Sequence, residues 1–188
     1  QRNSRDENKK IKNGVIPEEW EKPENKSKLA QKDIDADWTK KNGERHFGYK
    51  DHVKCDADSK LITNYSVTSA SVHDSQRCLV FIGQEDEVLY ADSAYSGKPI
   101  ALALPENCKN QICEKGYRNS PLTSEQKMNN RRKSRIRCRI EHIFGFMTGA
   151  MHGITIRSIG ITRAWMNIGI TNLVYNFCRY SYLKRASA

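Results

Sequence analysis

The sequence lacks any uninterrupted apolar segment long enough to cross a membrane. The most apolar long stretch, residues 159–178, contains Arg163 and three asparagines, which a helix facing lipid would not tolerate. The first ten residues, QRNSRDENKK, have no apolar core, so we expect no secretory signal peptide in this sequence. These absences predict a cytoplasmic protein without a membrane partner.

Cysteine is present, but not at the spacings that build common metal sites. The six cysteines include no CxxC, which is the commonest cysteine spacing of zinc sites. Cys108 and Cys113 are the only close pair in the sequence, so a structural zinc site there stays an alternative. Cys78, Cys138 and Cys178 fall in apolar helical patterns, which favours small buried thiols in a reducing cytosol.

Acidic residues are outnumbered by basic ones. The 188 residues contain 32 Lys and Arg against 22 Asp and Glu, so the formal net charge is +10. The pI is about 9.4 and the mean hydropathy is −0.77. This balance favours a polyanionic partner, although a merely soluble basic protein is the alternative on composition alone. The length fits one domain, or one domain with an appendage.

The first part of the chain divides into a polar segment and a hairpin pattern. Residues 1–45 are polar and show little apolar periodicity, which predicts an irregular arm or insertion. Apolar and polar side chains alternate with period two over residues 46–55, so we expect a strand with one solvent-exposed, cationic face. A turn at 56–59 and a β-branched, aromatic stretch at 61–68 complete an antiparallel hairpin.

Helical and strand patterns alternate in the rest of the chain. We expect helices over 71–83, 96–104, 130–147 and 160–183, and strands over 88–91 and 110–115. This order of elements predicts an α/β fold, in which helices cover a mixed sheet.

Asp92 follows directly on the apolar run VLYA at 88–91. Ligands of open α/β sheets bind outside the carboxyl ends of the strands. The small residues that follow, SAYSG at 93–97, would let a metal ion approach the carboxylate. The alternative is that Asp92 only caps the next helix, and the local sequence leaves both interpretations open.

Glu141 lies four residues after Arg137 on a predicted helix, so the two side chains share a face. It is rotated by about 100° from Ile140, at the margin of the apolar stripe, where a carboxylate can point into a cleft. The alternative is a solvated ion pair worth less than about 1 kcal/mol.

The run at 127–139 contains seven cations and no acid. These cations are Lys127, Arg131, Arg132, Lys133, Arg135, Arg137 and Arg139. A stripe of like charges destabilises its own helix by a few tenths of a kcal/mol per pair, and phosphate contacts would offset that cost. We therefore predict that these residues bind DNA, together with Lys50 and His52 on the cationic face of the hairpin. A solvated charged face is the alternative.

Four blocks in a fixed order resemble bacterial insertion-sequence transposases of the DDE type, most nearly the insertion-sequence-5-like group. The blocks are HFGYKDH (46–52), SVTSASVHDSQ (66–76), YADSAYSG (90–97) and RIRCRIEHIFGFM (135–147). The resemblance implies an RNase-H-like fold, as in retroviral integrases. It also implies three carboxylates that hold two Mg²⁺ ions, cleavage of the element's ends, and their transfer to target DNA by a homo-oligomer.

By this match, Asp92 is the second catalytic and metal-binding acid and Glu141 is the third, with Arg137 as the basic residue ahead of it. The chain departs from the pattern at Thr148, where the family commonly has Lys. It also begins after the point at which similar proteins carry the first Asp, on the first strand.

We therefore expect 46–188 to be a partial RNase-H-like catalytic domain with a C-terminal helix, missing its first strand and unable to cleave DNA by itself. A non-catalytic DNA-binding remnant, which inhibits the full transposase by competing for element ends, is the alternative. A hydrolase that acts on another phosphodiester is a third possibility. It would use both acids as catalytic residues, but it would not explain why the four blocks occur in this order.

Overall fold

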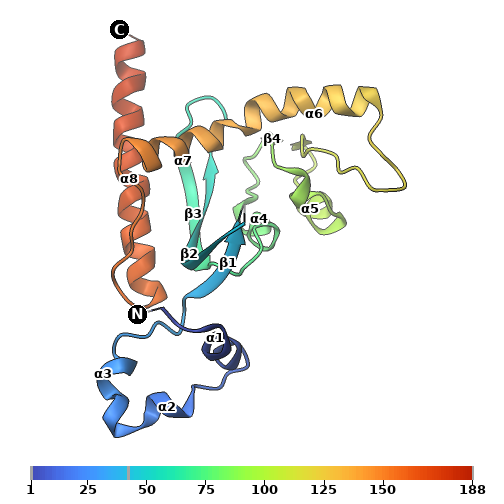
Figure 1. The fold of residues 1–188 in the computed structure, drawn as a ribbon. Helices are drawn as coiled ribbons and strands as arrows, with labels where there is room; N and C mark the ends of the chain where they lie inside the picture. Colours follow the sequence, from blue (N-terminus) through green and yellow to red (C-terminus); the bar gives the residue numbers. More distant parts are fainter. Residues whose placement is uncertain (1, 42, 188) are drawn as a thin grey trace. The chain divides into compact units, whose positions relative to one another are not determined.

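The computed structural model describes residues 2–41 and 43–187, which divide into two compact units. Unit 1 comprises Gln1–His52, Ser66–Val72 and Thr155–Thr171, and unit 2 comprises Val53–Tyr65, His73–Ile154 and Asn172–Ala188. The fold is mixed α/β, and the strands of the described part form a three-stranded and a two-stranded sheet among helices (Figure 1). None of the described helices combines the length and the apolar character needed to span a membrane.

The N-terminal segment is regular, so the prediction of irregular structure over 1–45 is wrong. It contains α1 (Arg5–Lys12), α2 (Glu18–Glu21), a 3₁₀ turn η1 (Pro23–Asn25), α3 (Lys26–Leu29) and β1 (Asp37–Lys41). Helix α1 begins with a capping box, in which Ser4 Oγ accepts from Glu7 N at 3.2 Å and Glu7 Oε2 accepts from Ser4 N at 2.5 Å. The S-x-x-E spacing is the sequence signal for this helix start.

Glu7 of α1 also contacts α2 and the segment that follows α3. Its Oε1 accepts from Trp20 Nε1 at 2.8 Å, and its Oε2 accepts from Lys32 Nζ at 2.9 Å. Burial raises the pKa of Glu7, but hydrogen bonds from Ser4, Lys32 and Trp20 and the charge of Lys32 outweigh burial and lower the pKa to about 2. The ionised form of Glu7 therefore stabilises unit 1.

Unit 1 is expected to lose stability as the pH falls from about 4.5 to about 2. The folded pKa of Glu7 lies below its ordinary value, so its contribution is full above the unfolded pKa of 4.5 and is lost as the pH falls through the folded value. We expect Glu7→Gln to lower the free energy of unfolding by about 1–2 kcal/mol at pH 7 and to weaken this acid sensitivity.

Tryptophan fluorescence during urea unfolding at pH 7 and pH 3 measures this effect, because Trp20, Trp38 and Trp165 all lie in unit 1. Glu24→Gln, which changes an exposed acid, is the matched control. A Glu7→Gln protein with the pH dependence of the unmodified chain would contradict this role.

Strand β1 is not predicted from the sequence. It pairs antiparallel with β2 (Glu44–Cys55), and Trp38 stands opposite Phe47 with the ring centroids 5.3 Å apart. Residues 37–41 have no apolar alternation of their own, so this cross-strand contact rather than a local pattern decides the pairing.

Strands β2 and β3 (Ile62–Ser69) form the predicted hairpin. Asp56 N donates to Leu61 O at 2.9 Å, and Asp56 Oδ1 accepts from Ser59 N at 2.7 Å, so one aspartate closes the turn by backbone and side chain. The prediction of a strand, a turn and a returning strand is confirmed.

The main core of unit 2 forms where α7 (Arg139–Gly149) and the C-terminal part of α8 (Ile161–Ala186) meet the hairpin. Ile143 and Met147, one turn apart on α7, are buried with Val53, Ile62 and Tyr175. Asn176 of α8 accepts from Ile62 N and donates to Ile62 O, both at 2.8 Å. The helix predicted over 160–183 is confirmed.

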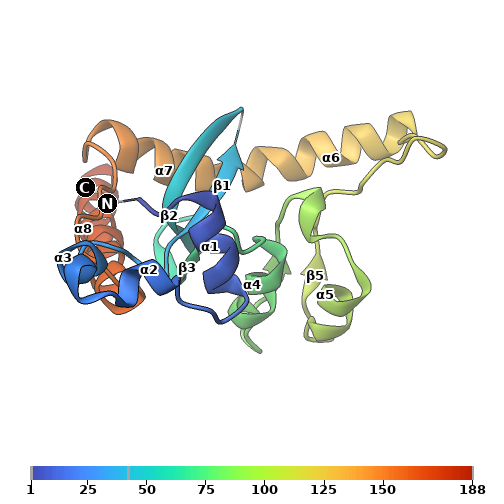
Figure 2. The same cartoon turned by 60° about the horizontal axis from the view of Figure 1, so that its bottom comes forward.

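A second sheet in unit 2 consists of β4 (Val88–Leu89) and β5 (Lys109–Asn110), which pair in parallel. Its backbone ladder continues past the strands, since Gln111 N donates to Leu89 O at 2.9 Å and Cys113 N donates to Ala91 O at 3.0 Å. Helices α4 (Ser75–Phe81) and α5 (Lys98–Ala103) accompany this sheet (Figure 2). The strands predicted over 88–91 and 110–115 are present, although shorter.

The cysteines are free thiols. Cys78 is buried, as predicted, together with Cys108 and Cys113. Cys138 is only half-buried, and Cys178 is exposed like its apolar neighbours on α8, Val174 and Phe177. The apolar pattern of that helix therefore does not mark a buried face there.

Candidate active site and nucleic-acid interface

Asp92 lies directly after the last hydrogen bond of the parallel ladder, which Ala91 O accepts. Its carboxylate is exposed, and Oδ1 accepts from Ser93 N at 2.6 Å at the start of the 3₁₀ turn η2 (Ser93–Tyr95). The other oxygen, Oδ2, makes no hydrogen bond within residues 2–41 and 43–187. Asp92 can therefore cap the turn and still offer an oxygen to a ligand.

Glu141 lies in the first turn of α7 and pairs with Arg137, with 2.7 Å between Oε1 and Nη2. The Glu141 side chain is 59% exposed and that of Arg137 is 26% exposed. A pair of this kind contributes little to stability, so its position matters more than its energy.

Arg137 connects the two acids electrostatically. Burial lowers its pKa, whereas the hydrogen bond and charge of Glu141, the charge of Asp92 and the Cys113 thiol raise it, and the net direction is upward. Two carboxylates that are far apart in the sequence thus act on the same guanidinium. The convergence of residues 92 and 141 on one metal ion stays a prediction.

The donor chemistry of the acid pair fits a hard divalent cation. Mg²⁺ prefers carboxylate oxygens and is commonly bound by one or two carboxylates, with water and phosphate oxygens completing its shell. Asp92 Oδ2 and Glu141 Oε2 are the oxygens left for such an ion. Within the part of the chain that the structure describes, no three His, Cys, Asp or Glu side chains lie close enough together to hold a metal.

Helix α6 (Ser124–Arg137) leads to this acid pair. It begins with a capping box, in which Thr123 Oγ1 accepts from Gln126 N at 3.2 Å and Gln126 Oε1 accepts from Thr123 N at 2.9 Å. Cys138, with a ψ of −7°, separates α6 from α7, and the two helices follow each other nearly end to end (Figures 1 and 2). The single helix predicted over 130–147 is therefore two helices, and the T-x-x-Q spacing is the sequence signal for the earlier start.

Three cations of the basic run have partners inside the protein. Lys133 Nζ donates to Ile112 O at 3.0 Å, and Arg137 pairs with Glu141. Arg139 donates to the carbonyl of Ala57 and lies 3.2 Å from an oxygen of Asp58. Lys133 and Arg139 thus attach α6 and α7 to neighbouring segments of unit 2, and Arg137 connects the two helices. All three charged groups therefore already have partners inside the protein.

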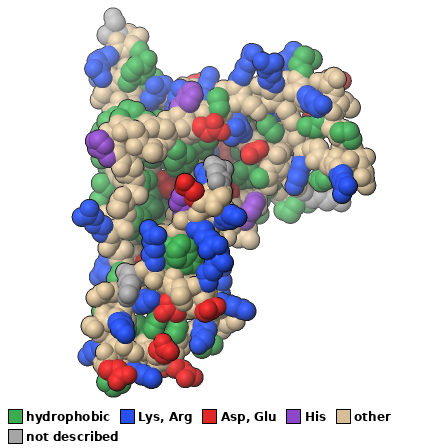
Figure 3. Space-filling view, in the orientation of Figure 1, with side chains coloured by type: hydrophobic (Ala, Val, Ile, Leu, Met, Phe, Trp, Pro, Cys, Tyr) green, Lys and Arg blue, Asp and Glu red, His purple; other side chains and the backbone are tan. Residues whose placement is uncertain are grey.

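The other four cations are exposed and make no hydrogen bond or ion pair in the described residues. They are Lys127, Arg131, Arg132 and Arg135, and we call them the open basic face. Figure 3 shows Lys and Arg side chains over the part of the surface that α6 forms. Like charges left unpaired on a helix are suited to phosphate contacts.

The two candidates on the hairpin lie in unit 1. Lys50 Nζ donates to Val72 O at 2.8 Å. His52 is only 7% exposed, and its Nε2 lies 2.8 Å from Thr68 Oγ1. The prediction that His52 faces a polyanion is wrong, because alternation separates two faces of a strand without saying which one is covered.

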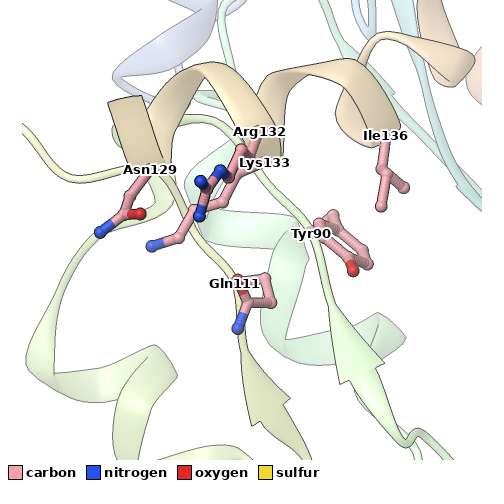
Figure 4. Close-up of a pocket in the computed structure, with 6 residues that line it drawn as sticks. All are labelled: Tyr90, Gln111, Asn129, Arg132, Lys133 and Ile136. Carbon is pink, nitrogen blue, oxygen red and sulfur yellow. The ribbon is translucent and has the colours of Figure 1, made fainter. Parts of the chain in front are cut away.

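Sequence reasoning missed a pocket of about 420 Å³ in unit 2. Its lining residues come from α6 and the segments at β4 and β5, and they are Tyr90, Gln111, Asn129, Arg132, Lys133 and Ile136 (Figure 4). The spacing 129, 132, 133 and 136 marks one face of a helix, which was a usable signal. Gln111 reaches the pocket through the parallel pairing of β4 and β5, for which the local sequence gives no signal.

The open basic face is the kind of surface by which proteins contact nucleic acid. The model of a family described as "Transposase DDE domain" matches residues 17–177, and the chain belongs to this family. The predicted membership among insertion-sequence DDE transposases is thereby confirmed.

Among known proteins, the chain is similar to the "Transposase for insertion sequence element IS1106" of Neisseria meningitidis serogroup B. The two are 33% identical over 117 residues, which cover 61% of this chain and 40% of the relative. The chain therefore spans less than half the length of this relative. No solved structure matches the chain.

Proposed function

We propose that this chain acts in DNA transposition, by metal-dependent cleavage and strand transfer at the ends of an insertion sequence. The observation that carries the proposal is the acid pair, since Asp92 and Glu141 both act on Arg137 beside a helix with four open cations. Membership in the DDE transposase family supports DNA as the substrate. The name of the relative supports an insertion sequence as the source of that DNA.

The roles of the residues follow from their chemistry. Asp92 and Glu141 bind the catalytic Mg²⁺, and Arg137 holds the Glu141 carboxylate in place. The open basic face positions the phosphate backbone of the DNA. Mg²⁺ held by Asp92 and Glu141 would supply activation of the attacking water or 3′-hydroxyl and stabilisation of the leaving oxygen.

We extend the proposal to the fold family and to the division of the chain into domains. Residues 46–188 would form part of an RNase-H-like catalytic domain of the insertion-sequence-5-like group, with 1–45 as an appended segment. The parallel ladder that ends at Asp92 supports this assignment, because ligands bind at the carboxyl ends of such strands. The intact enzyme would bind two Mg²⁺ ions and act as a homo-oligomer.

This polypeptide alone is expected to bind DNA without cleaving it, because two carboxylates lack the shared third ligand of a two-metal site. A non-catalytic, inhibitory role is the second candidate, and the open basic face favours it because phosphate contacts need no metal. Turnover in a Mg²⁺-dependent nicking assay on element-end DNA would contradict the inactivity. In the inhibitory case, added chain would slow a complete transposase at the same DNA ends.

Asp92→Asn and Glu141→Gln are each expected to weaken Mn²⁺ binding at least tenfold, because each removes one of two charged ligands. Free Mn²⁺ is measured by electron paramagnetic resonance during titration of the protein. Glu106→Gln, a change at an exposed acid, is the matched control and should leave binding unchanged. If Asp92→Asn bound Mn²⁺ as tightly as the control, the acid pair would not be the metal site.

A further inference from the structure

Strand β1 and the first residues of β2, all in unit 1, form a narrow two-stranded ribbon. The pairing is antiparallel and runs from Asp37 opposite Gly48 to Lys41 opposite Glu44. Two residues connect the strands, and one of them, Gly43, has a φ of +86°, a conformation that glycine adopts without strain. In Figures 1 and 2, β1 leads away from helices α1, α2 and α3 of the same unit to this end of the ribbon. A two-stranded β-ribbon is one of the elements that the major groove of DNA admits.

The end of this ribbon is cationic on one face. Lys40 and Arg45 stand directly opposite each other on the two strands. Both are exposed, and neither makes a hydrogen bond or an ion pair within residues 2–41 and 43–187. Like charges directly opposite each other on antiparallel strands destabilise the pairing. A polyanion bound to this face would offset that cost, in the same way as phosphate contacts would on α6.

The other face of the same end carries mixed charge. Lys41 stands opposite Glu44, and His46 Nε2 lies 3.9 Å from Glu44 Oε2. All three side chains are exposed. Because Glu44 partly neutralises this face, the face of Lys40 and Arg45 is the one suited to a polyanion.

An aromatic pair holds the cationic face in place. Trp38 stands opposite Phe47, two residues along the strands from the cations, so alternation places both rings on the cationic face. The ring centroids are 5.3 Å apart, and Trp38 Nε1 donates to Asn3 O at 2.8 Å. The two cations are therefore positioned by paired strands that are attached to the rest of unit 1, and such elements position side chains more precisely than loops do.

We propose that the end of this ribbon enters the major groove of the substrate DNA, with Lys40 and Arg45 directed toward the base edges. Arg and Lys donate to O6 and N7 of guanine, which is the commonest specific contact in that groove. The preferred DNA therefore contains guanine at the contacted positions. This inference rests on the proposed function, and it adds a contact that reads sequence, which the phosphate contacts of the open basic face do not provide.

Selection of bound duplexes from a pool of random sequence, followed by anisotropy titrations without divalent metal, tests the inference. The unmodified chain is expected to enrich a short sequence that contains guanine, and to bind it about tenfold more tightly than a scrambled duplex. In a second probe, 7-deazaguanine replaces the guanines of the enriched sequence and removes the N7 acceptor from the major groove. The preference for this probe over the scrambled duplex should fall to less than about threefold.

Two double variants of unit 1 remove the same number of charges. Lys40→Gln with Arg45→Gln is expected to reduce the preference for the enriched sequence to less than about threefold and to make binding insensitive to 7-deazaguanine. Its urea midpoint of unfolding should stay the same or rise, because the opposed like charges are gone. Lys22→Gln with Lys28→Gln, at exposed lysines outside the ribbon, is the matched control and should keep the preference.

Each contrary result has a distinct meaning. The absence of an enriched sequence, a preference that 7-deazaguanine leaves intact, or equal effects of the two double variants would overturn the role of the ribbon while leaving DNA binding in place. A lost preference together with a lower urea midpoint would show that Lys40 and Arg45 support the fold instead of reading bases. Failure of the unmodified chain to bind any duplex would overturn the proposed function as well.

Discussion

Duplex DNA is expected to bind about a hundredfold more weakly at 0.15 M salt when the four residues of the open basic face are replaced together by glutamine. Each phosphate that a cation neutralises releases condensed counterions, so the slope of log K against log salt changes by about 0.9 for each phosphate that is no longer neutralised. If all four side chains bind phosphates, the slope should decrease in magnitude by between about three and four. Anisotropy titrations at several salt concentrations measure both quantities.

The matched control removes the same number of charges from unit 1. Its substituted residues are the exposed lysines Lys9, Lys10, Lys22 and Lys28. This variant has the same net charge as the first, and its salt slope should stay close to that of the unmodified chain. Equal slopes for the two variants would mean that net charge, rather than the surface of α6, determines binding.

Ile143→Ala is expected to lower the free energy of unfolding of unit 2 by about 3–4 kcal/mol. Ile143 is 0% exposed and packs among Val53, Ile62, Met147 and Tyr175, so truncation removes buried area and leaves a cavity. Urea unfolding followed by circular dichroism at 222 nm measures the loss.

Met128→Ala is the matched control for this substitution. Met128 lies on α6 and is 51% exposed, so its truncation should cost less than about 0.5 kcal/mol. Equal losses for the two variants would show that α7 does not pack on the hairpin as described.

The parts of the fold that the sequence predicts well are those specified by local pattern. The alternation at 46–55 and the turn after it specify the hairpin, and the apolar spacing at 160–183 specifies α8. Strand β1 could not be predicted in this way, because the contact of Trp38 with Phe47 joins two strands. Helix α1 and the early start of α6 could have been predicted from their capping boxes, which are local signals.

The same distinction applies to the candidate site. Asp92 and Glu141 stand out because each follows a recognisable local pattern, an apolar run in one case and a basic helix in the other. Gln111 does not stand out, since its place in the pocket depends on the register of a parallel pair. The face that carries His52 was predicted to be exposed, but His52 is buried and lies 2.8 Å from Thr68 Oγ1 of the neighbouring strand.

The spacing of the cations on α6 limits how much DNA the helix can cover. Lys127, Arg131 and Arg135 recur every four residues, so they extend over about 12 Å of the helix axis. One strand of a duplex carries a phosphate about every 3.4 Å along its axis, and this length corresponds to about three or four base pairs. Such a footprint is less than half a turn of the double helix. It can align a backbone with the acids, whereas choosing one element end among many DNA sequences requires contacts made elsewhere.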